Sequence, residues 1–75
     1  MRITGTLSYI KVETEGKIVK IEGEMAVGGF AAYANTIKRW EAPHENIIID
    51  ETTKQRLIKE IVAESEKYDY KITFD

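Results

Sequence analysis

The sequence lacks cysteine altogether, and its 75 residues include a single histidine and a single proline. Without cysteine, disulfides and thiolate metal sites are excluded, and a reducing, cytoplasmic location is expected. The lone histidine, His44, has no second imidazole with which to complete a zinc site. Gly28 and Gly29 lack the GxxxxGK spacing and the following helix of a phosphate-binding loop. We therefore expect neither a bound metal nor a cofactor.

The chain also lacks a strong charge imbalance and a long apolar run. Its 11 basic and 13 acidic residues give a formal net charge of −2, and the two signs are interspersed. No basic field is available to concentrate nucleic acid. No apolar run is long enough to span a bilayer, and the first residues have a β-strand pattern rather than that of a signal peptide. We expect one domain, residues 1–75, that binds neither nucleic acid nor a membrane.

The strongest structural signal lies at residues 50–67, which predict one long amphipathic helix. Asp50 is a candidate N-cap, whereas a capping box from Thr52 to Gln55 would start the helix two residues later. The apolar stripe follows a 3.6-residue period and consists of Leu57, Ile58, Ile61, Val62 and, as its extension, Tyr68. Such a helix must cover its stripe with a sheet or a second helix.

The remaining segments predict strands. Residues 2–13 and 17–24 are rich in β-branched residues and are joined by a glycine turn, and a change of side-chain parity near Ser8 and Tyr9 indicates a bulge or bend. A short third strand is expected at residues 30–34, a helical turn at 35–40, and a final alternating strand at 70–74. The pattern predicts an α+β two-layer fold, in which an antiparallel sheet of about four strands carries the helix on one face.

One pair of carboxylates is a candidate for chemistry. Glu22 and Glu24 share a strand face and could bind a divalent cation or act as acid and base. A solvated strand face beside Lys20 is the favoured interpretation. Ser8 and Ser65 do not lie in the glycine-flanked elbow that a nucleophilic serine needs. We expect that the protein is not an enzyme.

Short motifs spread over nearly the whole chain carry a family resemblance. They are Ile21 to Glu24, Gly29 with Phe30, Thr36 to Glu41 with Pro43, the acid-started helix at Asp50, and the terminal Lys71 to Phe74. This pattern resembles a small immunity-protein family of bacterial polymorphic toxin systems. The resemblance implies a cytoplasmic protein that binds one cognate toxin domain and neutralises it by stoichiometric protein–protein contact. It assigns no functional residues.

A partner surface must therefore be inferred from the residues themselves. Acids along the first hairpin can complement a basic partner. Most aromatic residues are expected in the core, and core packing is favoured for Trp40 too, although a tryptophan beside a loop can anchor a partner. The expected partner-binding set is Glu13, Glu15, Glu22, Glu24, Trp40, Glu41 and His44.

Two alternatives remain open. A homo-oligomeric structural or regulatory module, for example a homodimer, would associate through an exposed sheet edge, for which the third and final strands are the candidates. A metal-dependent enzyme would be centred on Glu22 and Glu24.

Overall fold

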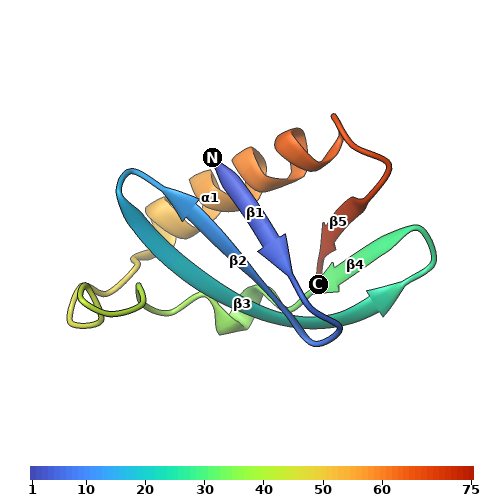
Figure 1. Cartoon of the computed structure of the whole chain (residues 1–75). Coiled ribbons are helices and arrows are strands. Elements are labelled where there is room, and N and C mark those ends of the chain that lie inside the picture. The colour runs from blue at the N-terminus through green and yellow to red at the C-terminus, as the bar shows by residue number, and fades with distance from the viewer.

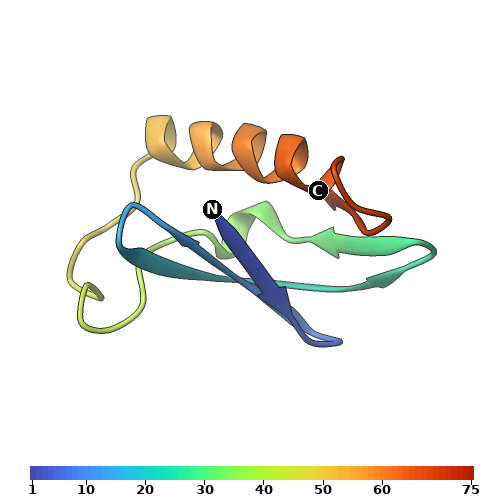
Figure 2. The ribbon, with the colours of Figure 1, turned by 45° about the horizontal axis from the view of Figure 1, so that its top comes forward.

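The computed structural model describes all of residues 1–75 and shows a curled sheet with one α-helix lying across its inner face (Figures 1 and 2). Its five strands follow one another across the sheet in the order β1-β2-β3-β4-β5. The elements are β1 (Arg2–Gly5), β2 (Tyr9–Thr14), β3 (Lys17–Ala26), β4 (Gly29–Ala32), the 3₁₀ helix η1 (Ala34–Thr36), α1 (Glu51–Ser65) and β5 (Lys71–Phe74). The predicted α+β fold with one helix on one face of a sheet is confirmed.

The sheet has one strand more than the sequence indicated, because the segment at residues 2–13 forms a hairpin. The chain reverses between β1 and β2, where the Thr6 N–H donates to the Tyr9 carbonyl at 2.8 Å and the Ser8 N–H donates to Thr6 Oγ1 at 3.3 Å. The parity change near Ser8 and Tyr9 therefore marks a turn and not a bulge. The expected antiparallel pairing holds for β1 to β4, whereas β5 pairs with β4 in parallel, since α1 returns the chain to the end from which β4 started.

β3 is the longest strand, with 10 residues, and it joins the two halves of the sheet. Its first half pairs with β2 and its second half with β4, and Gly23 stands at the change of partner. A side chain at Gly23 would meet the Ala31 carbonyl oxygen at 2.3 Å and the Phe30 ring at 2.6 Å. Because Gly23 has no side chain, the Phe30 ring can pack directly against the backbone where β3 changes its partner.

Gly29 has a similar role at the parallel pair. It lies opposite Lys71 in the register of β4 and β5, and an added Cβ would be 1.8 Å from the Lys71 carbonyl oxygen. Because no side chain stands there, β5 can approach β4 closely enough to pair with it. Glycine at this position is what admits the final strand to the sheet.

The core fills the space between α1 and the inner sheet face. Cross-strand register puts Ile3, Val12 and Val19 in one row, and Leu57 and Ile61 of α1 are fully buried against the sheet. One cluster contains all the buried apolar residues: Ile10, Val12, Val19, Ile21, Phe30, Ala32, Ile37, Trp40, Ile49, Leu57, Ile61 and Ile72. Burial of this cluster is the main source of stability.

Asp50, the first of the two predicted N-caps, is the N-cap of α1. The Asp50 carboxylate accepts a hydrogen bond from the Thr53 N–H at 2.8 Å, which pairs one of the free amides of the first turn. The helix ends at Ser65, two residues before the predicted end, so Tyr68 lies beyond it and does not extend the stripe. With 15 residues and charges on most turns, α1 has neither the length nor the apolar run that a bilayer crossing requires.

Candidate protein-interaction site

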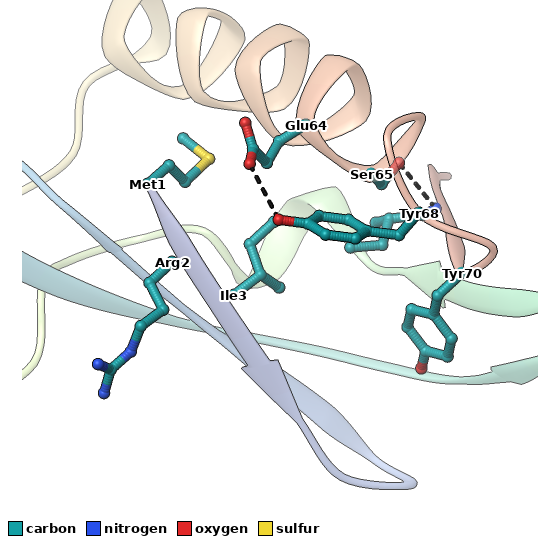
Figure 3. Close-up of a pocket in the computed structure, with 8 residues that line it drawn as sticks. Met1, Arg2, Ile3, Glu64, Ser65, Tyr68 and Tyr70 are labelled. Atoms are coloured by element: carbon teal, nitrogen blue, oxygen red, sulfur yellow. Dashed lines mark hydrogen bonds between the residues drawn. The ribbon is translucent and has the colours of Figure 1, made fainter.

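An apolar pocket of about 440 Å³ lies between the two outermost strands, β1 and β5, beneath the last turn of α1 (Figure 3). The curl of the sheet brings these two strands to opposite sides of the same opening. Its lining residues are mostly apolar: Met1, Ile3, Tyr68, Tyr70 and Ile72, together with Arg2, Glu64 and Ser65. The arrangement offers an apolar recess with a polar margin, which is the usual chemistry of a binding pocket.

Two tyrosines form the wall of this pocket on the side of β5. Tyr68 extends across the opening towards Ile3, and its hydroxyl donates to Glu64 Oε2 at 3.4 Å (Figure 3). The Tyr70 hydroxyl lies 3.6 Å from the sulfur of Met25. Tyr68 is 58% exposed and Tyr70 37%, so these rings are available at the surface. The core position expected for most aromatic residues does not hold for these two, which lie in the connection between α1 and β5.

Ser65 closes the deep end of the pocket and is the one buried polar residue, 2% exposed. Its hydroxyl donates to the Val62 carbonyl at 2.9 Å and accepts a hydrogen bond from the Ile72 N–H at 3.2 Å. Ile72 belongs to β5, and its N–H points away from β4. Ser65, in the last turn of α1, supplies the acceptor that this N–H does not find in a neighbouring strand. β5 is an edge strand, as predicted, but the other predicted edge is wrong: β4 lies between β3 and β5, and β1 is the second edge.

Three of the acids named from the sequence lie on the outer sheet face, opposite α1. Register and strand alternation place Glu13, Glu22 and Glu24 there, with Lys20 between them. Glu13 is 3.6 Å from Arg2 Nε, whereas Glu22 has no ion-pair partner. The outer face therefore has mixed charge with a free carboxylate at Glu22.

Besides Glu13, two more of the acids are engaged by neighbouring side chains. Glu15, at the β2–β3 turn with a positive φ of 56°, lies 2.8 Å from Arg56 of α1, and this hydrogen bond raises the pKa of the guanidinium. Glu24 accepts a hydrogen bond from the Tyr33 hydroxyl, which raises the pKa of that phenol. No three His, Asp or Glu side chains are grouped so as to hold a metal ion.

The remaining three residues of the expected set are in the loop that follows η1. Trp40 is 5% exposed and belongs to the core, as the favoured interpretation held, with the Lys17 ammonium 5.4 Å from its ring centre. The Glu41 N–H donates to the Ile18 carbonyl at 2.7 Å, and the His44 N–H donates to the Glu41 carbonyl at 2.8 Å. The Glu41 bond attaches the loop to the side of β3 that does not pair with β2, and the His44 bond closes a turn within the loop. Glu41 and His44 are half-buried.

The structure thus separates two surfaces. The acids predicted from the sequence lie on the outer sheet face, at the β2–β3 turn and in the adjoining loop. The apolar pocket lies between the sheet edges, and sequence reasoning missed it. The sequence feature that indicates this pocket is a pair of tyrosines, Tyr68 and Tyr70, which flank Asp69 in the short connection after the helix. Aromatic side chains in a connection of this kind are exposed unless the core has room for them.

The fold is that of a small α+β protein with an exposed apolar recess. More particularly, the chain belongs to an immunity-protein family: the family model described as Immunity protein 74 matches residues 2–75. This match confirms the resemblance to an immunity-protein family. No curated protein and no solved structure has significant similarity to the chain.

Proposed function

We propose that the protein binds a cognate bacterial toxin domain in the cytoplasm and neutralises it by one-to-one contact, as a non-enzymatic inhibitor. Membership of the immunity-protein family over residues 2–75 is the observation that carries this proposal. An inhibitor that acts by contact gains affinity when its surface is ordered before binding. The single core cluster, which holds α1 against the sheet, supports such pre-organisation.

The outer sheet face and the adjoining turn and loop are the proposed charged part of the toxin-binding surface. Exposed carboxylates there can steer a basic toxin surface and fix its orientation. Glu22 is the strongest member, since its exposed carboxylate has neither an ion-pair partner nor a hydrogen-bond partner. Glu24, in contrast, is bonded to Tyr33, and Glu41 is half-buried. Trp40 would act by supporting the loop from the core. The proposed set is Glu13, Glu15, Glu22, Glu24, Trp40, Glu41 and His44.

Co-expression with the toxin domain encoded immediately upstream tests the proposal. Cells that produce the toxin domain alone should lose viability, and cells that also produce this chain should survive and yield a complex in pull-down. Toxicity that persists despite soluble co-expression, with no complex, would contradict the proposed function. The matched control is the same chain with Leu57→Asp, which places a charge in the core and should remove both protection and complex formation.

A second candidate function is self-association through a sheet edge, and the unpaired edge of β1 is the observation that favours it. Light scattering over a range of concentrations separates the two candidates. A mass of about 8.6 kDa at every concentration would exclude the homo-oligomer.

A further inference from the structure

We propose that the partner adds an extended segment to the free edge of β1 and places apolar side chains of that segment in the pocket between β1 and β5. This inference rests on the proposed function, because it names the surface by which the toxin domain would be held. It is carried by the main-chain geometry of β1, by the partly occupied edge of β5, and by the charges on either side of the opening.

The backbone of β1 presents unpaired hydrogen-bonding groups at its outer side. The Thr6 N–H bonds to the Tyr9 carbonyl, and along an antiparallel pair every second residue bonds to the same neighbour. Arg2 and Thr4, which lie opposite Glu13 and Lys11, belong to the same alternating set as Thr6 and direct their N–H and C=O groups towards β2. The N–H and C=O groups of Ile3 and Gly5 therefore point away from β2, and no side chain bonds to them. Alternating donors and acceptors of this kind match another strand.

The opposite edge of the sheet does not offer the same surface. In β5 the corresponding amide at Ile72 is already paired by Ser65, which is buried under the last turn of α1. The Phe74 N–H also points away from β4 and has no partner, so β5 keeps part of its edge free. A segment that enters the opening therefore finds two unpaired amides on β1, at Ile3 and Gly5, and one on β5, at Phe74. This asymmetry selects β1 as the edge that is extended.

The pocket determines the sequence character of the added segment. Residues of a strand paired with β1 alternate between the two sheet faces, so every second side chain points inward, beside Ile3 and under α1. These inward side chains meet the apolar walls formed by Tyr68 and Ile72.

On the outer face the segment would pass between Arg2 of β1 and Lys71 of β5, both exposed. Arg2 lies 3.6 Å from Glu13. The Lys71 ammonium donates to the Glu66 carbonyl at 3.5 Å, so Lys71 is the cation with no carboxylate partner. An alternation of apolar and acidic residues is therefore the complementary pattern.

A second copy of this chain fits the opening less well than an isolated segment does. Its β1 is backed by β2, so pairing two β1 edges would bring the second copy's β2 towards β5 on the far side of the pocket. Its β1 also carries Arg2 and Thr4 on the outer face, and neither is acidic. An extended segment of the toxin domain has neither limitation.

Amide hydrogen exchange with the upstream-encoded toxin domain as probe tests this inference. Binding should slow exchange at Ile3 and Gly5 at least tenfold, because their amides gain hydrogen bonds, while Ile72 should change little. Slowed exchange at Ile3 and Gly5 in the chain alone, growing with its concentration, would assign the edge to a second copy and overturn the inference. Unchanged exchange at these amides in a saturated complex would also overturn it.

Four variants provide an independent test by calorimetry. Ile3→Pro removes an outward N–H, while Ile3→Ala loses the same apolar packing and keeps that N–H, so the proline variant should bind about tenfold more weakly than the alanine variant. Lys71→Glu, at an exposed position, should weaken binding several-fold without affecting the fold. If Lys71→Glu and Ile3→Pro bind like the wild type and Glu22→Lys does not, the edge inference fails and the proposed function stands. Absence of binding by the wild type would overturn both.

Discussion

Ser65 illustrates how one side chain links the helix, the final strand and the pocket. Its hydroxyl is both donor and acceptor, and it pairs an edge amide that β4 cannot reach. The sequence indicated a structural role for Ser65 rather than a nucleophilic one, which agrees with these hydrogen bonds. The residue that Ser65 would bond to could not be predicted from its position in the last turn of a helix. The partner, Ile72, is found only when β5 is placed beside β4.

Ser65→Ala should lower the free energy of unfolding by about 1–3 kcal/mol, because the Ile72 N–H would remain buried without an acceptor. Urea denaturation measures the change. Ser8→Ala is the matched control, since Ser8 is exposed and should change stability by no more than about 0.5 kcal/mol. Equal stability of the two variants would show that the buried hydrogen bond contributes nothing.

At the scale of the element, α1 depends on a cap that titrates. The Thr53 N–H donates to the Asp50 carboxylate and holds the pKa of Asp50 below its ordinary value of 3.8. The folded state therefore binds this proton less readily than the unfolded state does. Its contribution to stability is fully present above the ordinary pKa and is lost as the pH falls through the folded value.

Asp50→Ala should accordingly lower the midpoint of thermal unfolding at neutral pH, by roughly 4–8 °C. The difference between wild type and variant should stay constant from pH 7 to pH 5 and narrow below pH 3.8. Thermal unfolding followed by circular dichroism across this range measures it. A difference that persists undiminished at pH 2 would contradict the role of the ionised carboxylate.

Local patterns were sufficient to predict α1, the β2–β3 hairpin and β5. The helix start followed from Asp50, and the strands followed from the alternation of β-branched and aromatic residues. The β1–β2 turn was missed because Thr6 to Ser8 contain no glycine, proline or asparagine, and Thr6 closes the turn with its own hydroxyl instead. The parallel pairing of β5 could not be predicted, since it depends on contacts between residues distant in sequence.

At the scale of the whole molecule, the pocket exists because the sheet curls until its first and last strands, β1 and β5, both line it (Figure 1). Its residues come from the beginning of the chain and from residues 64–72. No sequence window contains both groups, so the site could not be predicted without the fold. The acids of the outer face were accessible to sequence reasoning because strand alternation fixes their side. Their part in toxin binding remains a prediction.

The central claim is that one copy of this protein inhibits one toxin domain by contact. Titration of the purified chain into the purified upstream-encoded toxin domain, with toxin activity as the readout, tests it most directly. At toxin concentrations well above the dissociation constant, activity should fall linearly and reach zero at one molar equivalent. Full toxin activity in the presence of a large molar excess of the folded chain would contradict the claim.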